Sequence, residues 1–427
     1  MEHLLHYVWK HKLFPLKILQ TTKGLPVEVI DPGLHNSNAG PDFFNAKLKI
    51  DGTLWVGNVE IHTHASDWFR HGHESDKTYD SVILHVVAEP DAEVSRSNGE
   101  VIPQLQLTCP EHIQTHYHEL CAADQYPACY SVISSLPKLT IHSWLTALQT
   151  ERLEQKAKLI GERLKRCGSN WEDAFFITLA RNYGFGLNGD AFEMWAGLLP
   201  FRAVDKHRND LFQIEAFFFG MAGLLEETFL KKEQEDDYSF RLRKEFRYLQ
   251  RKFEITQVMD ASLWSFLRLR PENFPHVRLA QLAYLYQKAD KLFSRVLEAE
   301  TLSEVRAILR TRTSAYWKDH FMFGRPSPER EKTMGEGSLN LIVINTVVPF
   351  LYTYGLHKAD DGMCERAGRF LEELKAENNH IIRSWSNAGL PVTSAADSQA
   401  LIQLRKEYCD KRKCLYCRFG YEYLRKK

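Results

Sequence analysis

Two long antiparallel strands joined by a tight turn restrict the fold of this chain more than any other feature of its sequence. Residues 43–50 alternate between apolar and polar side chains, and residues 53–64 continue as the partner strand. Between them lies Asp51-Gly52, a dipeptide that favours the two-residue turn of a β-hairpin. The pattern therefore predicts a sheet built around this hairpin.

The segments around the hairpin predict a mixed α/β domain over residues 1–132. Residues 2–13 have the spacing of an amphipathic helix, and residues 27–30 form a short strand before the hairpin. Residues 66–79 are polar and predict a loop with a short helix, whereas residues 81–87 are β-branched and apolar, which is typical of a buried central strand. The predicted order is a helix, three strands, a partly helical crossover and further strands.

The pattern becomes helical after this domain. Segments rich in Leu, Glu, Lys and Arg, separated by Pro and Gly, predict a larger all-α domain over residues 133–399. Residues 400–427 form a basic segment that carries three cysteines. The predicted fold class is therefore α+β, with an N-terminal mixed α/β domain followed by a larger helical domain.

The composition is that of a soluble globular protein, with 44% hydrophobic and 26% charged residues. The N-terminal residues MEHLLHYVWKHK do not show the basic-then-apolar pattern of a signal peptide. No uninterrupted apolar stretch approaches the roughly 20 residues that cross a bilayer. We therefore expect a cytoplasmic protein with no membrane contact, in which the eight cysteines are thiols or metal ligands.

Two acidic residues of the hairpin are candidates for a metal site. Asp42 precedes the first strand, and pairing across a two-residue turn places Glu60 opposite Phe43, one residue from Asp42. One bulge or register slip brings the two carboxylates within reach of one ion. Carboxylate ligands suit Mg²⁺ or Mn²⁺, and a metal-bound water is acidic enough to attack a phosphodiester.

A third residue is needed to orient and partly deprotonate the attacking water. His62 lies on the same strand face as Glu60, since alternate residues of a strand share a face, and its neutral imidazole can accept a proton near pH 7. Lys77, in the segment after the hairpin, is a second candidate for this role. The predicted catalytic residues are Asp42, Glu60, His62 and Lys77.

Histidines in and after the hairpin form a second, overlapping group, to which His85 on a later strand also belongs. Imidazole ligands at this density favour Zn²⁺, Mn²⁺ or Fe²⁺ over Mg²⁺. The spacing Gly57-x4-His62-x-His64 also resembles the first motif of cupins, although the glutamate expected after the second histidine is absent. The sequence leaves open a hydrolytic metal site, a metal site without hydrolysis and a set of structural polar residues. The predicted ligands are Asp42, Glu60, His64, His71, His73 and Asp76.

Three cysteines close the chain in the pattern Cys409-x4-Cys414-x2-Cys417. In a reducing compartment this spacing indicates metal thiolates, either of a structural zinc ion or, with a fourth cysteine, of an iron–sulfur cluster. For zinc we expect the sulfurs to lie about 3.5–4 Å apart around one point. The candidates for the fourth ligand are Cys364, His357 and His380.

Charge is distributed unevenly along the chain, although the net charge is zero. Residues 405–427 contain nine basic and three acidic residues, which suits contact with a phosphate backbone. We therefore expect DNA or RNA as a partner, bound through the helical and C-terminal parts.

Several short motifs resemble a bacterial family that is catalogued only as a domain of unknown function. The resemblance extends over nearly the whole chain and implies no established activity and no functional residue. The motifs are Gly40-Pro-Asp-Phe43, Gly57-Asn-Val-Glu-Ile-His62, Ser66-Asp-Trp68, Arg270-Pro-Glu-Asn-Phe-Pro275, Arg278-x-Ala-Gln-Leu282 and the closing cysteines.

Asp42 and Glu60 also resemble the acidic pair of the PD-(D/E)xK nuclease superfamily, over about residues 1–107. This resemblance implies a restriction-endonuclease-like fold in which the two carboxylates hold Mg²⁺ or Mn²⁺. The chain departs from the superfamily at His62, where a lysine is usual. The predicted function is metal-dependent phosphodiester hydrolysis on DNA or RNA. The alternative is a non-catalytic nucleic-acid- or protein-binding protein with a degenerate nuclease-like domain.

Overall fold

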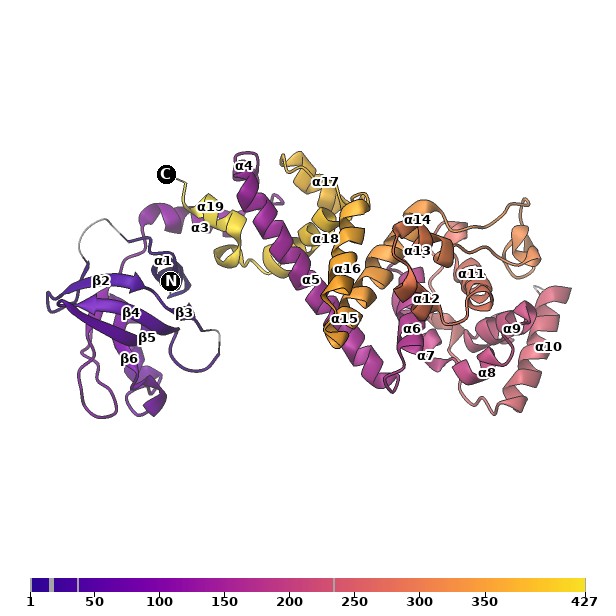
Figure 1. Ribbon diagram of the computed structural model, residues 1–427, viewed down its shortest axis with the longest axis horizontal. Coiled ribbons are helices and arrows are strands. Elements are labelled where there is room, and N and C mark those ends of the chain that lie inside the picture. The colour runs from indigo at the N-terminus through magenta and orange to yellow at the C-terminus, as the bar shows by residue number, and fades with distance from the viewer. Residues whose placement is uncertain (1, 15–18, 37, 233–234, 427) are drawn as a thin grey trace. The chain divides into compact units, whose positions relative to one another are not determined.

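The structure is a computed structural model that describes residues 2–14, 19–36, 38–232 and 235–426 (Figure 1). Most of its strands lie in the N-terminal part of the chain, and helices dominate the remainder. A mixed α/β part followed by a larger helical part is therefore confirmed at this level of the fold class.

The chain forms two compact units, and the second is inserted into the first along the sequence. The first unit comprises Met1–Ile141, Ser384–Leu390 and Leu404–Lys427, and the second comprises His142–Arg383 and Pro391–Gln403. The C-terminal cysteine-rich segment, which the sequence indicated as a separate part, thus belongs to the same unit as the sheet.

A mixed sheet lies in the first unit. Its strands follow the order β1-β2-β4-β5-β6-β7, and β3 pairs with β4 beside this path. The pairs from β1 to β5 are antiparallel, whereas β5, β6 and β7 run parallel to one another. The strands are β1 (Leu19–Gln20), β2 (Pro26–Asp31), β3 (Leu34–His35), β4 (Phe43–Ile50), β5 (Thr53–His64), β6 (Val82–Glu89) and β7 (Gln104–Gln106).

The crossover between β5 and β6 contains the short helix α2 (Asp67–Arg70) and the 3-10 turn η1 (Lys77–Tyr79). Parallel neighbours require such a crossover, because the chain must return to the same end of the sheet before the next strand begins. Helix α1 (Glu2–Lys10) precedes the sheet and packs against β5. The predicted helix, the three strands that correspond to β2, β4 and β5, the partly helical crossover and the later strands are confirmed, and the structure adds the two-residue strands β1 and β3 before the crossover.

The β4–β5 hairpin turns at Asp51 and Gly52, as predicted. Both residues have positive φ angles, 48° and 79°, which a two-residue turn matched to the twist of the strands requires. The first residues of β5 are exposed, whereas Val59 to His62 are buried beside β6. The candidate site therefore lies in the buried half of this strand.

A bulge in β4 changes the register between the turn and the site. Ala46 pairs with Gly57, but Phe43 pairs with Val59, so β4 contains one extra residue between the two pairs. Within the bulge, Asn45 has a φ of 55° and its backbone N–H donates to a side chain of β5 (3.1 Å). The extra residue aligns Asp42, which precedes Phe43, with Glu60, which follows Val59. These are the two acidic residues of the predicted site.

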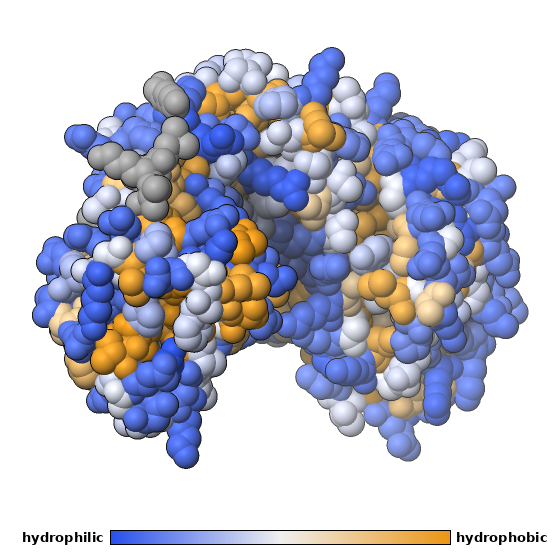
Figure 2. Space-filling view, turned by 60° about the vertical axis from the view of Figure 1, so that its left-hand side comes forward, coloured by the Kyte–Doolittle hydropathy of each residue, from blue (hydrophilic) through white to orange (hydrophobic). Residues whose placement is uncertain are grey.

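Apolar side chains also reach the surface of the first unit, and Figure 2 shows them as orange patches on the side turned toward the viewer. Leu54, Trp55 and Val56 at the start of β5 are exposed, as are Ile30 of β2 and Leu34 of β3. These residues lie outside the buried half of β5, so the candidate site and the exposed apolar surface occupy different parts of the sheet.

The end of the chain packs within the first unit. The imidazole Nδ1 of His116 lies 3.3 Å from the carbonyl oxygen of Leu424, and the hydroxyl of Tyr423 donates to Glu119 (2.9 Å). The elements involved are α3 (Glu111–Ala122), α4 (Tyr130–Ile133), η7 (Leu404–Cys409), η8 (Cys414–Tyr416) and α19 (Arg418–Leu424).

Helices form the second unit, and aromatic side chains such as Phe175, Trp195 and Phe218 fill its core. Helices α5 (Lys138–Arg166) and α17 (His380–Asn387) cross its boundaries with the first unit. The other elements are α6 (Trp171–Tyr183), α7 (Gly189–Leu198), α8 (Phe201–Asp205), α9 (Leu211–Met221), α10 (Asp237–Lys252), η3 (Ala261–Leu263), η4 (Pro271–Asn273), α11 (Pro275–Lys288), α12 (Leu292–Glu298), α13 (Leu302–Leu309), η5 (Ala315–Lys318), β8 (His320–Met322), β9 (Arg325–Pro326), α14 (Glu336–Ile342), η6 (Val343–Val347), α15 (Val348–Lys358), α16 (Asp361–Glu373) and α18 (Ala395–Gln403).

One helical segment, Glu336–Lys358, is long and apolar enough to cross a membrane by length and composition. However, 67% of its most apolar window is buried inside the protein, which is the burial of a core helix.

Gly57 provides a test of the packing between β5 and β6. A Cβ atom at this position would lie 2.4 Å from Cγ2 of Ile83 and 2.8 Å from the carbonyl oxygen of Ser81. We therefore expect Gly57→Ala to lower the free energy of unfolding by about 1–3 kcal/mol, measured by urea denaturation. The control is Gly161→Ala in α5, where a Cβ meets nothing within 4 Å and the better helix former stabilises by up to about 1 kcal/mol. Equal stabilities of the two variants would contradict this packing.

Candidate metal centre

Asp42 and Glu60 are linked to each other's strands by a reciprocal pair of hydrogen bonds. The backbone N–H of Asp42 donates to Oε2 of Glu60 (3.0 Å), and the backbone N–H of Ile61 donates to Oδ2 of Asp42 (2.9 Å). The bulge in β4 makes this exchange geometrically possible, since it aligns the two acidic residues across the strand pair. The structure therefore brings together the two carboxylates that the sequence had paired.

His6 of α1 contacts the carboxylate of Asp42. Its Nε2 lies 3.3 Å from Oδ2 of Asp42. Burial acts to raise the pKa of the Asp42 carboxyl, but the hydrogen bond and the charge of His6 outweigh it and lower this pKa. The same contact outweighs the effect of burial on His6 and raises the pKa of its imidazole. The two residues thus favour each other's charged form.

Glu60 is almost fully buried and directs its second oxygen toward two histidines. Oε1 lies 3.5 Å from Nε2 of His62 and 3.4 Å from Nε2 of His73. Burial, with a contribution from the negative charge of Asp42, raises the pKa of Glu60 to about 7. The carboxyl is therefore poised to lose its proton near neutral pH when a cation approaches.

Three histidines converge beside Glu60. One ring nitrogen from each of His62, His71 and His73 lies within 4.8 Å of the other two. Nδ1 of His71 is 3.2 Å from Nε2 of His62, and the ring of His73 stacks on that of Tyr79 with centroids 3.7 Å apart. This arrangement matches the histidine group indicated by the sequence, and its nitrogens are close enough to hold one metal ion.

Three residues predicted for the site lie away from this cluster. His64 is two residues farther along β5, where its Nε2 lies 3.8 Å from Glu89 of β6. Asp76 caps η1 by accepting the N–H of Thr78 (2.9 Å), and Lys77 is exposed on the same turn. Asp76 and Lys77 are therefore parts of a local turn, in which Asp76 serves as the cap. The predicted roles of His64, Asp76 and Lys77 are not supported by their positions.

The cupin interpretation is wrong. It required His62 and His64 to act together, but His64 turns to the outer end of β5. It also required a double-sheet antiparallel fold, whereas β5, β6 and β7 are parallel neighbours in one mixed sheet.

A chain of hydrogen bonds sets where His62 carries its proton. The amide Nε2 of Gln104 donates to the carbonyl of Ala92 (2.8 Å) and faces Nδ1 of His85 (3.4 Å). Since the amide nitrogen can only donate, His85 accepts at Nδ1 and carries its hydrogen at Nε2. This hydrogen points to Nδ1 of His62 (2.9 Å). His62 therefore holds its own hydrogen at Nε2, which lies 3.2 Å from Nδ1 of His71 and 3.5 Å from Oε1 of Glu60.

Both histidines of this chain are neutral at pH 7. Burial, followed by the positive charge of neighbouring histidines, lowers the pKa values of His62 and His85 to about 3. A neutral imidazole has one donor and one acceptor, so the direction of the chain from Gln104 is defined.

The sequence did not reveal His6 or Gln104 as parts of the centre. His6 lies in the amphipathic pattern of α1, and Gln104 lies in a three-residue strand. Each reaches the site only because its element packs beside β5 or β6, so no local spacing could indicate the contact.

A comparison with protein families identifies the wider group to which this centre belongs. A family model described as "Protein of unknown function (DUF2851)" matches residues 2–380. The chain belongs to this family. The resemblance noted from the short motifs is thereby confirmed. No curated protein and no solved structure matches the chain.

In this DUF2851 protein, the buried Glu60 predicts a pH-dependent loss of stability. Its folded-state pKa of about 7 exceeds the ordinary value of 4.5. Its contribution to the free energy of unfolding is therefore fully present below pH 4.5 and is lost as the pH rises through 7. We expect Glu60→Gln to stabilise the metal-free protein at pH 8 by about 1–3 kcal/mol relative to wild type, with a much smaller difference at pH 5.

Urea denaturation in the presence of a chelator at both pH values measures this effect. The matched control is Glu89→Gln, because Glu89 is an exposed carboxylate near His64. If the free energies of unfolding of Glu60→Gln and wild type differ by the same amount at pH 5 and at pH 8, the Glu60 carboxyl titrates normally.

Proposed function

We propose that this protein is a metal-dependent phosphodiesterase that acts on DNA or RNA, with its centre at Asp42, Glu60 and the histidine cluster. One observation supports this function above all others. A pair of carboxylates, the half-buried Asp42 and the buried Glu60, is linked across neighbouring strands and lies beside three imidazoles whose nitrogens are within 4.8 Å of one another. Burial of Glu60, His62 and His73 in one place costs stability, which is typical of a functional site.

The ligand set favours particular ions. Glu60, His71 and His73 supply one oxygen and two nitrogens, and such mixed ligands suit Mn²⁺, Zn²⁺ or Fe²⁺ better than Mg²⁺, which prefers oxygen. Of the two ions expected from the carboxylates alone, Mn²⁺ is therefore the better candidate. A divalent ion bound here supplies Lewis acidity and an acidic water.

His62 is proposed to hold a proton at the reacting centre. The chain from Gln104 through His85 leaves its Nε2–H directed to the side of Glu60, where a water or a phosphoryl oxygen can accept it. The lysine that is usual at this position in the nuclease superfamily is also a hydrogen-bond donor. His62 is thus a chemically reasonable replacement, with a neutral donor in place of a cationic one.

Asp42 is proposed to orient the centre. Its Oδ2 accepts the N–H of Ile61 and contacts His6, which keeps its carboxylate charged and in one position. A fixed negative charge beside Glu60 strengthens the attraction of the site for a cation.

The topology of the first unit supports a nuclease-like function. A helix is followed by antiparallel strands, a partly helical crossover and a strand parallel to the last one. The nuclease resemblance expects one acidic residue at the opening of a strand and the other on the next strand, and the positions of Asp42 immediately before β4 and of Glu60 on β5 are consistent with this expectation.

A nucleic-acid partner is proposed from charge. Residues 405–427 contain nine basic and three acidic residues and belong to the same unit as the centre. Two of the basic side chains pair with acidic ones, Arg405 with Asp410 and Lys411 with Glu407. Exposed cations such as Lys406 and Lys413 are then candidates for phosphate contacts.

Cleavage in the presence of Mn²⁺ is the direct test. Purified protein is incubated with plasmid, single-stranded DNA and RNA, and we expect Glu60→Ala to lower cleavage at least about 100-fold because a metal ligand is lost. The matched control is His64→Ala, on the same strand but outside the cluster. Circular dichroism must show that both variants are folded. Activity that persists in Glu60→Ala would place the chemistry elsewhere.

Metal binding separates the proposed enzyme from a non-catalytic protein with a degenerate site. Because His73 offers a nitrogen 3.4 Å from Oε1 of Glu60, we expect His73→Ala to weaken Mn²⁺ or Zn²⁺ binding by about 10–100-fold in calorimetric titrations. His64→Ala again serves as the control. Tight metal binding without cleavage of any tested substrate would favour the non-catalytic alternative.

A further inference from the structure

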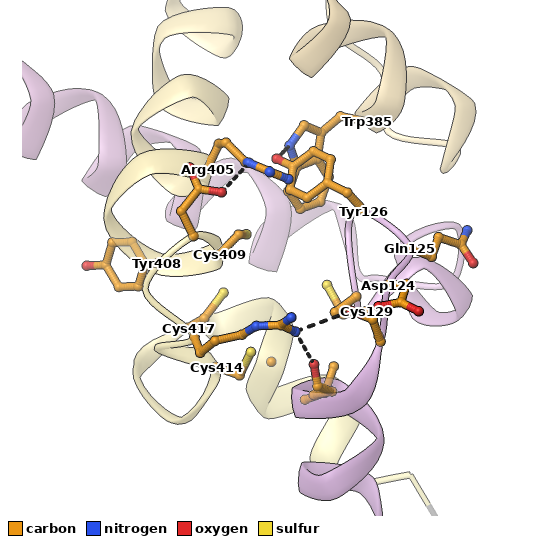
Figure 3. Close-up of a pocket in the computed structure, with 16 residues that line it drawn as sticks. Asp124, Gln125, Tyr126, Cys129, Trp385, Arg405, Tyr408, Cys409, Cys414 and Cys417 are labelled. Atoms are coloured by element: carbon orange, nitrogen blue, oxygen red, sulfur yellow. Dashed lines mark hydrogen bonds and ion pairs between the residues drawn. The ribbon is translucent and has the colours of Figure 1, made fainter.

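A fourth cysteine joins the three at the end of the chain. Cys129, Cys409, Cys414 and Cys417 all line one cavity of about 220 Å³. Figure 3 shows their side chains around this space, Cys129 from the loop before α4 and the others from the C-terminal segment. All eight cysteines lie in the described part of the chain, and none of them is in a disulfide.

The four thiols are shielded from solvent at the wall of this cavity. Cys129 and Cys417 are buried, and Cys409 and Cys414 are half-buried. A metal ion binds thiolates, so it would displace the protons of these thiols.

We propose that Cys129, Cys409, Cys414 and Cys417 together ligate a four-iron iron–sulfur cluster. Four cysteine thiolates are the complete protein ligand set of such a cluster. This site is separate in its residues from the proposed hydrolytic centre, and the inference does not depend on the proposed function.

The spacing of the sulfurs favours a cluster over a single zinc ion. Around zinc, with a Zn–S distance of about 2.3 Å, four sulfurs lie about 3.8 Å apart. Among the described residues, three ligand atoms come within 4.8 Å of one another in the histidine cluster and not among these cysteines. In any set of three of these sulfurs, at least one pair is therefore farther apart than tetrahedral zinc ligation requires, and a cuboidal cluster of four irons and four sulfides fills a wider space.

The fourth ligand differs from those that the sequence suggested. Cys364, His357 and His380 belong to the second unit, whereas every residue that lines the cavity belongs to the first. Cys364 lies 3.7 Å from the carbonyl of Tyr352, and the ring of His357 contacts that of Trp171. None of the three suggested ligands lines the cavity.

The surroundings of the cavity suit a negatively charged metal–thiolate group. Arg412 donates to the carbonyls of Leu120 (3.0 Å) and Ala123 (3.3 Å), and its charge acts to lower the pKa of Cys414. Arg405 lies over the ring of Tyr126, 3.8 Å from its centroid, and its charge acts in the same way on Cys409. Cations at the wall compensate the charge of the thiolates, and aromatic side chains limit the access of water.

The position of the cysteines in the sequence indicates what the cluster does for the fold. Cys129 precedes the inserted second unit, and the other three follow it. A metal bound by both sides connects the two ends of the interrupted first unit directly. Because metal binding to such a site adds to the free energy of folding, the cluster holds residues 404–427 against the N-terminal part.

Anaerobic purification of the full-length protein from iron-supplemented cells tests the proposal. We expect about four iron and four acid-labile sulfide per chain, and a broad visible absorption that is bleached by dithionite. The iron content of Cys129→Ser should be at least about tenfold lower than that of wild type. Cys121→Ser is the matched control, since Cys121 lies near Cys414 but does not line the cavity, and its iron content should equal that of wild type.

Each alternative result overturns a defined part of the proposal. One equivalent of zinc without iron would overturn the cluster, undiminished iron in Cys129→Ser would overturn the ligand set, and protein without metal would overturn the site. If Cys129→Ser does not fold, alkylation of the cysteines in the wild-type protein tests the ligand set instead. Cys129, Cys409, Cys414 and Cys417 should become reactive together only after iron is removed by a chelator, whereas reactivity before chelation would contradict the site.

Discussion

The reciprocal hydrogen bonds between Asp42 and Glu60 are the constraint on which the candidate centre depends. Each carboxylate accepts a backbone N–H from the other's strand, so the same contacts hold the register of β4 against β5 and the positions of both side chains. Without the bulge in β4, Glu60 would face Phe43, and the two acidic groups would not meet. The extra residue in one strand thus determines whether the two carboxylates of the candidate centre meet.

Burial determines the electrostatics of this centre. The contact with His6 lowers the pKa of the Asp42 carboxyl, whereas burial and the negative charge of Asp42 raise the pKa of Glu60, which therefore binds a proton more tightly than usual. His62 and His85 remain neutral, since an imidazolium in the same place would be equally costly. The centre therefore disfavours a charged side chain wherever no opposite charge lies beside it.

The interrupted first unit presents a different physical problem. Its C-terminal segment returns after an insertion of more than two hundred residues and must find α3 and the loop that carries Cys129. Closing so long a connection costs conformational entropy, and direct contacts near the end of the chain offset it. A metal held by cysteines from both sides would add to these contacts, and it would link the two parts without any contribution from the inserted helices.

The sequence alone determined the elements whose signals are local. Alternation and the Asp51-Gly52 turn defined the hairpin, and the change of pattern separated the sheet from the helical part. The acidic pair was predictable to within one residue, since a two-residue turn places Glu60 opposite Phe43, next to Asp42, and only the bulge in β4 completes the alignment.

Only the tertiary structure decided which other residues join them. His6, Gln104 and Cys129 reach their partners through the packing of elements that are distant in sequence, while His64 and Lys77 lie near the site in sequence and point elsewhere. Periodicity specifies the face of a strand or helix on which a side chain lies. The partner of that face is determined by long-range burial, which no local pattern encodes.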